Sequence, residues 1–268
     1  MTDDPLGYLK SLGESGSGPH DIARAALMLS ILDHADVSLE PCLAHLAEIE
    51  AAMRAEAPMI LRVGDGARAV AALLAGRLGY EGDRATYDDP RNADLVSVID
   101  RRRGLPVALG ILYIHAARAA GMTAAGLDTQ GHFLVRFTFR HDDVTVDPFG
   151  GGGIVDREHM PLELQGRDAA LAQPVGDTDV LLRLQNNLKL RALDRGEVAR
   201  GREIASRMVL IAPRRPDLWF DLARINEAMG ILGAARNAYE HCVELARPGE
   251  ALHNEAAVAL AGLRRRLN

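Results

Sequence analysis

Apolar residues recur with a helical period over roughly the first eighty positions of the chain. In DIARAALMLSILDHA the apolar side chains of Ile22, Ala25, Ala26, Leu29 and Leu32 fall on one helix face. SLEPCLAHLAEIEAAMRAE and GARAVAALLAGRLGY continue the same kind of pattern. We therefore expect three helices between about residues 20 and 80, before any strand.

The period changes from helical to alternating near residue 122. PVALGILYIHAARAAGM is apolar on most faces, which predicts a buried helix that stops at Gly121. HFLVRFTF and DVTVDPF alternate apolar and polar residues, so we expect two antiparallel strands joined by a turn at residues 140–143. A short strand over 122–127 precedes them. We expect the glycine run at 150–153 to end the sheet, and 156–176 to form a loop and a short helix.

From about residue 178 the chain is helical again and carries an internal repeat. Aligning LDRGEVARGREIASRMVLIAPRRP with EAMGILGAARNAYEHCVELARPGE places Gly196 on Gly230 and Met208 on Cys242, 34 residues apart. This offset is the period of tetratricopeptide repeats. The second copy has the large, small, turn and breaker residues that two packed helices need: Trp219, Ala223, Gly230, Ala235, Tyr239 and Pro248. A generic alanine-rich helical hairpin is the alternative. ALHNEAAVALAGLRRRL would cap the last repeat.

Composition and charge narrow the class of protein. The 268 residues are 48% hydrophobic and 25% charged, as in ordinary globular proteins. A net charge of -6 gives no general attraction to nucleic acid or to an anionic membrane. MTDDPLGYLK has neither a basic leader nor an apolar core, and no run reaches the roughly 18 apolar residues of a membrane span. Cys42 and Cys242 are expected to be buried, inert thiols. We expect a cytoplasmic, bacterial-type protein.

The order of the motifs resembles a known family. GYEGDRATYDDPRNADLVSVIDRRRGLPVALGILYIHAARAAGM, GHFLVRF and VDPFGGG are similar to the SirB family of bacterial proteins, which join a transglutaminase-like domain to C-terminal tetratricopeptide repeats. The resemblance implies an α+β, mostly helical fold: a transglutaminase-like (papain-like) core with a small antiparallel sheet, followed by a helical domain. It implies a transglutaminase-like domain with N-terminal helices over 1–176 and about two repeats with a capping helix over 177–268.

The same resemblance assigns catalytic positions. In this superfamily a cysteine at a helix start, a histidine on a strand and an aspartate on the next strand form a triad. His132 takes the place of the histidine and Asp147 that of the aspartate, but Pro106 stands at the position of the cysteine. Ser, Thr and Lys are absent between Gly104 and Gly121, so this helix carries no alternative nucleophile. His132 is either a structural residue bonded to Asp147 or a remnant of a catalytic or ligand-binding site, in which the pair could activate water.

Other polar residues precede the helix at Pro106. Asp89, Asn92, Arg102 and Arg103 could bind an anionic or peptide ligand at the helix start. Their alternative role is turn formation and ion pairing, which we favour.

We expect neither a metal nor another cofactor. His132 and Asp147 could be joined by His141 or His159, but no HxH or HExxH spacing supports a metal site.

These observations favour a non-catalytic protein-interaction or scaffold protein. A degenerate transglutaminase-like core would present a groove, and the repeat helices would bind a protein or peptide partner. The alternative is a hydrolase or transamidase that acts on peptide or amide bonds with His132, Asp147 and an unidentified nucleophile. A third possibility is that the repeat helices support the core or mediate self-association.

Overall fold

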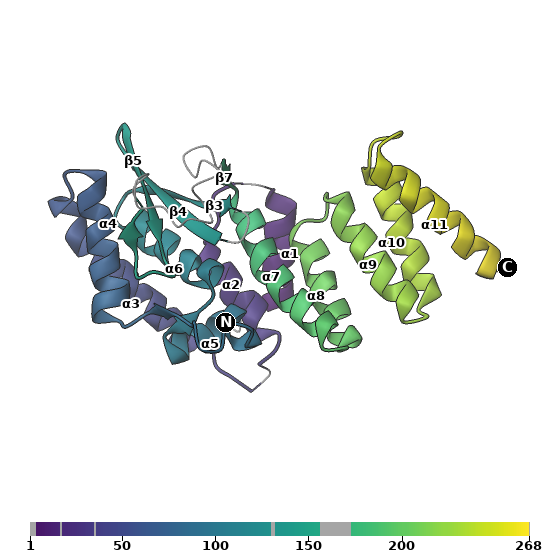
Figure 1. Ribbon diagram of the computed structural model, residues 1–268, viewed down its shortest axis with the longest axis horizontal. Coiled ribbons are helices and arrows are strands. Elements are labelled where there is room, and N and C mark those ends of the chain that lie inside the picture. The colour runs from purple at the N-terminus through teal and green to yellow at the C-terminus, as the bar shows by residue number, and fades with distance from the viewer. Residues whose placement is uncertain (1–3, 17, 35, 130–131, 156–172, 268) are drawn as a thin grey trace. The chain divides into compact units, whose positions relative to one another are not determined.

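The chain folds into two compact units. A computed structural model describes residues 4–16, 18–34, 36–129, 132–155 and 173–267. One unit is Ser17–Leu184, and the other combines Met1–Gly16 with Gln185–Asn268. We call them the core unit and the helical unit. Figure 1 labels the α-helices of both units and the longer strands.

Helices dominate the first part of the core unit. They are α2 (Ile22–Ile31), α3 (Glu40–Glu56), α4 (Val63–Ala71), α5 (Leu95–Arg101) and α6 (Pro106–Ala119), with the short helical turns η1 (Ala57–Met59), η2 (Ala72–Arg77) and η3 (Pro90–Ala93). The expectation of three helical segments between residues 20 and 80 is confirmed by α2, α3 and α4 with η2. Asp21 starts the first of these, because its carboxylate accepts a hydrogen bond from the Arg24 amide at 3.1 Å.

A five-stranded antiparallel sheet follows α6 along the chain. Its order is β6 (Gly153–Ile154), β5 (Asp142–Asp147), β4 (His132–Phe139), β3 (Thr123–Thr129) and β7 (Pro174–Val175). The three strands expected from the alternating pattern are therefore confirmed. Together with the helices around it, this sheet makes the fold α+β and mostly helical, as expected.

The expected end of the sheet at the glycine run is wrong. Gly151 and Gly152 have φ angles of 85° and 80°, and the Gly152 amide bonds to the Asp147 carbonyl oxygen at 2.7 Å. Positive φ angles let the chain reverse here. Because of this reversal, β6 returns alongside β5 with Val146 opposite Ile154. Most of the loop and short helix expected over 156–176 lies outside the described residues, and β7 occupies part of the remainder.

Helix α6 packs on the sheet through a glycine. All residues from Val107 to Ala117 are buried, as the apolar pattern predicts. A methyl group at Gly110 would lie 2.4 Å from Cε1 of Phe133 and 3.5 Å from the Val135 side chain. The helix axis can therefore approach β4 closely only because position 110 lacks a side chain. The helix ends with Gly121 at a φ angle of 81°, as expected.

The helical unit contains α1 (Pro5–Ser15), the end of α7 (Asp177–Asp194), α8 (Val198–Ile211), α9 (Pro216–Ala228), α10 (Leu232–Leu245) and α11 (Ala251–Leu267), coloured green to yellow in Figure 1 except for α1. The 34-residue offset aligns its two hairpins. Gly196 and Gly230 have φ angles of 74° and 72°. Each begins the same turn: the Glu197 amide bonds to the Ala192 carbonyl at 2.8 Å, and the Ile231 amide to Asn226 at 2.9 Å. The repeat is thus a repeated helical hairpin, and its tetratricopeptide class stays a prediction.

The division between the units differs from the expected boundary at residues 176 and 177. It falls between Leu184 and Gln185, inside α7. The start of α7 belongs to the core unit because the buried Asp177 carboxylate accepts hydrogen bonds from Arg118 at 2.7 and 2.8 Å and from the His20 amide at 2.7 Å. Across the ranges that the structure describes, no helix combines the length and apolar character that a membrane crossing requires.

Candidate functional site

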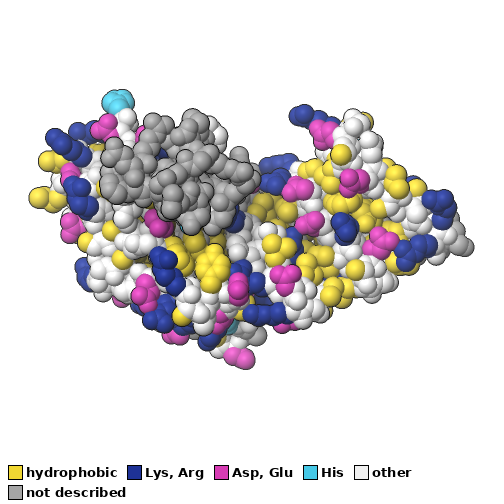
Figure 2. All heavy atoms as spheres, viewed as in Figure 1, with side chains coloured by type: hydrophobic (Ala, Val, Ile, Leu, Met, Phe, Trp, Pro, Cys, Tyr) yellow, Lys and Arg dark blue, Asp and Glu magenta, His cyan; other side chains and the backbone are white. Residues whose placement is uncertain are grey.

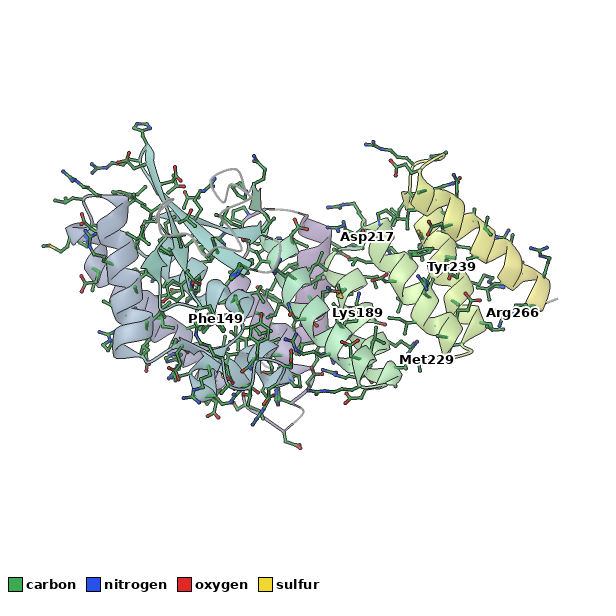
Figure 3. All side chains as sticks on the ribbon, viewed as in Figure 1. Phe149, Lys189, Asp217, Met229, Tyr239 and Arg266 are labelled. Carbon is green, nitrogen blue, oxygen red and sulfur yellow. The ribbon has the colours of Figure 1, made fainter. Side chains whose placement is uncertain are left out.

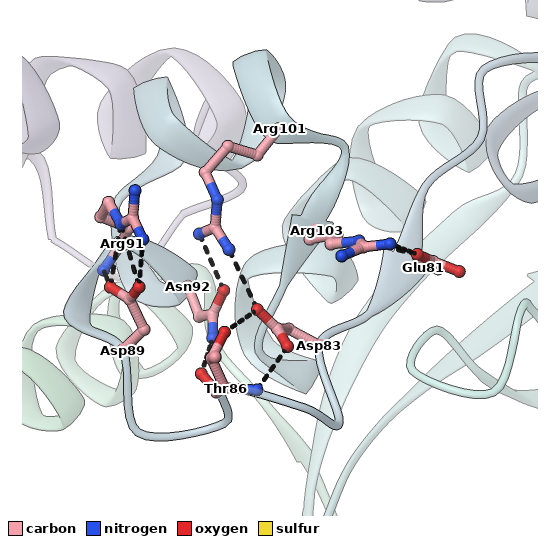
Figure 4. Close-up of polar contacts among 8 residues, drawn as sticks. All are labelled: Glu81, Asp83, Thr86, Asp89, Arg91, Asn92, Arg101 and Arg103. Atoms are coloured by element: carbon pink, nitrogen blue, oxygen red, sulfur yellow. Dashed lines mark hydrogen bonds and ion pairs between the residues drawn. The ribbon is translucent and has the colours of Figure 1, made fainter.

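A buried polar network supports the start of α6, as Figure 4 shows. Asp83 is 3% exposed and accepts hydrogen bonds from the amide and hydroxyl of Thr86, at 2.8 and 2.6 Å. Arg101 donates to Asp83 at 3.0 Å and to the side-chain oxygen of Asn92 at 3.0 Å. The Thr86 hydroxyl is the main cause that lowers the pKa of Asp83, and its amide, Asn92 and Arg101 lower it further against the effect of burial. The carboxylate is therefore ionised, and both of its oxygens accept hydrogen bonds.

Asn92 links this network to the helix. Its side-chain amide donates to the Thr86 carbonyl at 2.6 Å, and its own carbonyl accepts from the Leu105 amide at 2.8 Å. Leu105 is the N-cap of α6, and Pro106 occupies the first turn, where a missing N–H costs nothing. Asn92 is completely buried. Its predicted role as a ligand contact therefore gives way to a structural one, which is the alternative that the sequence favoured.

The first turn of α6 carries no nucleophilic side chain, since Leu105, Pro106 and Val107 form it. The two thiols lie in other helices, Cys42 in α3 and Cys242 in α10, and both are buried and free. Burial raises the pKa of Cys42, and it raises the pKa of Cys242 to about 11. Both thiols are thus protonated at neutral pH, which makes them weak nucleophiles.

His132 and Asp147 lie at neighbouring strand ends. His132 begins β4 and Asp147 ends β5, and Val135 pairs with Val146 between them. Continuing this register by one residue places Asp147 opposite Leu134, so His132 is its diagonal neighbour on the same sheet face. Such neighbours have Cα atoms about 7–8 Å apart. The pairing of the two side chains and its catalytic role both stay predictions.

Alternation along β4 also separates His132 from α6. Phe133 and Val135 meet Gly110 of α6, so they define the helix-covered face of the sheet. His132 falls on the opposite face, and its carbonyl oxygen accepts a hydrogen bond from Arg183 at 3.2 Å. A proton transfer to the first turn of α6 would have to pass around the end of β4.

The Asp147 carboxylate makes a contact within its own turn. Oδ1 of Asp147 accepts a hydrogen bond from the Phe149 amide at 2.9 Å. Phe149 then packs against β1 (Glu81–Gly82), where a methyl group at Gly82 would lie 2.5 Å from the ring. Asp147 thus holds the turn that carries the Phe149 ring.

Tyr113 of α6 is a buried polar residue near the same turn. It is 1% exposed, and its hydroxyl has no hydrogen-bond partner among the described residues. A methyl group at Gly152 would lie 2.5 Å from that oxygen. Burial, and secondly the Asp147 charge, raise the pKa of Tyr113. The phenol therefore stays neutral and cannot act as a base.

Three further predicted ligand contacts make internal ion pairs or hydrogen bonds. Asp89 caps η3 and pairs with Arg91 at 2.6 Å. Arg102 ends α5 with a φ angle of 58°, and its guanidinium bonds to the Tyr80 hydroxyl and, at 2.5 Å, to Nε2 of His45. Arg103 pairs with Glu81 at 2.7 Å, and both side chains are more than half exposed. Of the four predicted residues, Arg103 alone lines the groove described next.

A groove of about 630 Å³ lies beside the Asp147 turn. One side is formed by the segment around β1, and the other by the Phe149 turn. Its lining residues are Ala75, Gly79, Tyr80, Glu81, Gly82, Asp83, Arg84, Ala85, Arg103, Phe149, Gly150 and Gly151. Phe149 is labelled in Figure 3. Sequence reasoning missed Arg84 and Phe149 as site residues, because nothing in the local pattern shows that they meet.

Aromatic and cationic side chains gather at this groove. The Arg84 guanidinium lies 5.0 Å from the centre of the Phe149 ring, in a cation–π arrangement. Tyr87 meets the same ring edge-on, with centroids 5.9 Å apart, and is 42% exposed.

Within the described ranges, no three His, Cys, Asp or Glu side chains are grouped so as to hold a metal ion. His141 lies on the exposed β4–β5 turn, and His159 lies outside the described residues. The charged residues that line the groove are Glu81, Asp83, Arg84 and Arg103.

Comparisons with known proteins agree with this architecture. The model of a family described as the transglutaminase-like superfamily matches residues 40–186. A UPF0162 protein of Xylella fastidiosa is 33% identical over 187 residues, which is 66% of this chain and 66% of that protein. A UPF0162 protein of Vibrio cholerae is 32% identical over 96 residues, or 35% of each chain. F-box only protein 21 of Mus musculus is 30% identical over 125 residues, 43% of this chain and 20% of that protein.

The chain spans just under two thirds of the length of the Xylella relative that it matches. No solved structure matches. The family model, however, covers more than half of the 268 residues, and it includes α6, the sheet strands and the groove. On this evidence the chain belongs to the transglutaminase-like superfamily.

Proposed function

We propose that this protein is a non-catalytic protein-interaction protein built on a transglutaminase-like fold. In this role the groove of the core unit holds an extended peptide segment of a partner, and the helical hairpins contact the same partner. The observation that carries the proposal is Pro106 in the first turn of α6, where the superfamily resemblance places a cysteine nucleophile. Binding would then use the groove without cleavage.

The groove supports this proposal through its shape and chemistry. It combines a guanidinium stacked on Phe149 with backbone from a short strand, and the exposed Tyr87 contacts the Phe149 ring next to it. Aromatic residues and arginine are the side chains that contribute most at protein interfaces. The turn held by Asp147 keeps Phe149 in place.

The helical unit offers a second contact surface, which we assign to tetratricopeptide-like repeats in a SirB-type protein. Figure 2 shows hydrophobic side chains at the surface over α8, α9 and α10. Leu190, Met229 and Ile231 are 50%, 36% and 37% exposed. Exposed apolar side chains that gather on one surface are typical of protein contact sites. We also propose a cytoplasmic location, which the free thiols support.

A peptide selection tests the proposal. Peptides are selected from a displayed library on the full-length protein, and their affinities are measured by fluorescence anisotropy. We expect His132→Ala to bind them like the wild type, and Phe149→Ala to bind about tenfold more weakly, because aromatic truncation at an interface centre commonly costs more than 1 kcal/mol. Mass spectrometry after long incubation should recover the peptides intact. If the wild type cleaves or deamidates the peptides and His132→Ala leaves them intact, the hydrolase alternative is established instead.

Substitutions of Asp147 distinguish peptide binding from peptide hydrolysis more clearly. In a triad, Asp→Asn leaves the geometry but damages proton transfer severely. As a support of the Phe149 turn, Asp147→Asn keeps an oxygen that accepts the Phe149 amide, whereas Asp147→Ala removes it. We expect the Asn variant to bind selected peptides like the wild type and the Ala variant to bind them more weakly. Equal binding by all three proteins would contradict the supporting role.

A further inference from the structure

The groove has a free strand edge along one side. Strand β1 pairs in parallel with β2 (Arg103–Gly104), and Glu81 and Asp83 donate their amides to the carbonyls of Arg102 and Gly104, at 3.0 and 3.3 Å. Successive residues of a strand point their peptide groups to opposite sides, so the N–H and C=O of Gly82 point away from β2. Among the described strands β1 pairs with β2 alone. Gly82 lines the groove and offers a ligand a donor and an acceptor that no other described strand uses.

The charged side chains along the groove differ in whether another side chain of the protein pairs with them. The Asp83 carboxylate is buried. Arg101 neutralises its charge, and Thr86 donates two hydrogen bonds to it. Arg103 is offset by Glu81. Arg84 is exposed and stacks on Phe149, and none of the acidic side chains that the structure describes forms an ion pair with it. The groove thus presents one uncompensated positive charge, held in place by an aromatic ring.

We infer that the groove takes an acidic, extended peptide segment. The segment adds a strand to the free edge of β1, where its backbone pairs with Gly82, and one of its Asp or Glu carboxylates pairs with Arg84. Addition of a strand to an open sheet edge is a general mode of peptide recognition, in which the backbone provides affinity and side chains provide selectivity. The inference rests on the proposed peptide-binding function and specifies its ligand.

Matched peptides test the role of charge. The peptides are an Asp/Glu-rich library and its Asn/Gln counterpart, and binding to the full-length protein is followed by fluorescence anisotropy. We expect the best acidic peptide to bind at least about tenfold more tightly than its amide counterpart, as a charge-assisted contact with arginine requires. Arg84→Glu should abolish this preference. The control is Arg140→Glu, because Arg140 also stacks on an aromatic ring, 5.3 Å from the Phe139 centroid, but lies outside the groove.

Methylation of the peptide backbone tests strand addition. In a strand added to β1, one peptide amide donates to the Gly82 carbonyl oxygen and the neighbouring amides face away, so an N-methyl group should weaken binding at that position but not at the positions next to it. An even effect along the peptide would overturn the strand geometry. Equal affinity of acidic and amide peptides, or unchanged selectivity of Arg84→Glu, would overturn the ligand class while leaving the proposed function intact. If no peptide of either library binds, both the inference and the proposed function fail.

Discussion

At the scale of single residues, the buried hydroxyl of Tyr113 is expected to lower the stability of the folded protein. Its hydroxyl is buried without a partner among the described residues. An unsatisfied buried hydroxyl costs about 1–3 kcal/mol. We predict that Tyr113→Phe leaves the free energy of unfolding unchanged or raises it by about 1 kcal/mol, as measured by urea denaturation.

Tyr239 is the matched control for this change. It is also buried, but its hydroxyl bonds to Oε2 of Glu227 at 3.1 Å. Tyr239→Phe should therefore lower the stability of the helical unit by about 1 kcal/mol. A clear loss of stability in Tyr113→Phe as well would mean that the Tyr113 hydroxyl has a bonding partner.

His45 makes stability depend on pH. Its ring is buried in α3, and Nε2 faces the Tyr80 hydroxyl at 2.9 Å and the Arg102 guanidinium. Burial first, and then the Arg102 charge, lower the pKa of His45 below its usual value of about 6.5. The unfolded chain therefore takes up the proton more readily than the folded one. Stability is complete above about pH 6.5 and falls as the pH drops through the lowered pKa of the folded state.

The corresponding prediction concerns His45→Gln. Glutamine retains an acceptor for Arg102 but does not titrate, so the variant should lose less stability than the wild type between pH 7 and pH 5. Native-state hydrogen exchange of α3 amides provides the measurement. His141→Gln, on the exposed β4–β5 turn, should follow the wild type. Parallel pH profiles for His45→Gln and the wild type would contradict this account.

At the scale of elements, Gly110 decides how α6 meets the sheet. Alanine is the better helix former by about 1 kcal/mol. A methyl group at position 110 would nevertheless collide with Phe133, which contacts Gly126 of β3 in the same way. We predict that Gly110→Ala lowers the unfolding free energy by about 1–3 kcal/mol, the usual cost of overpacking. Gly76→Ala is the control, because a methyl group there meets no atom within 4 Å. Equal stabilities of the two variants would refute the close approach.

Elements with a clear period were predictable from the sequence, and short ones were not. HFLVRFTF alternates over a full strand, and it became β4 with the expected bounds. β6 and β7 have two residues each, and β1 and β2 are equally short, so no period can appear within them. Their pairing depends on distant backbone, as when Glu81 meets Arg103. Sequence pattern therefore located α6 and the two strand ends of the candidate site.

The groove escaped prediction for a related reason. Phe149 follows a strand and Arg84 lies in a polar turn, and each is ordinary in its local context. They meet because the Asp147 turn folds back onto β1. The same limit applies to Asn92, whose burial follows from contacts with Thr86 and Leu105 rather than from its own segment. The roles of these residues depend on contacts between distant segments, and residue types within one segment do not predict such contacts.

At the scale of the whole molecule, the first residues of the chain belong with the last. Helix α1 groups with the helical unit, although the sequence placed it in the N-terminal domain. Its closest approach is at Gly13, where a methyl group would lie 2.2 Å from the Leu210 carbonyl oxygen of α8. The apolar residues Leu9 and Leu12 on the same helix are buried. The contact between α1 and α8 therefore covers one side of the hairpin stack, which needs a neighbour to bury its apolar face.

This grouping predicts that one substitution near the N-terminus loosens the C-terminal helices alone. Gly13→Val must displace α1 from α8, so hydrogen exchange should accelerate in α8 and α9 while α6 keeps the wild-type rate. Gly18→Val is the control, since a Cβ atom at position 18 meets no atom within 4 Å and the residue belongs to the core unit. Faster exchange in α6 than in α8 would assign α1 to the core unit instead. An unchanged pattern in both units would show that α1 contributes little to either, and the helical stack would then be stable without it.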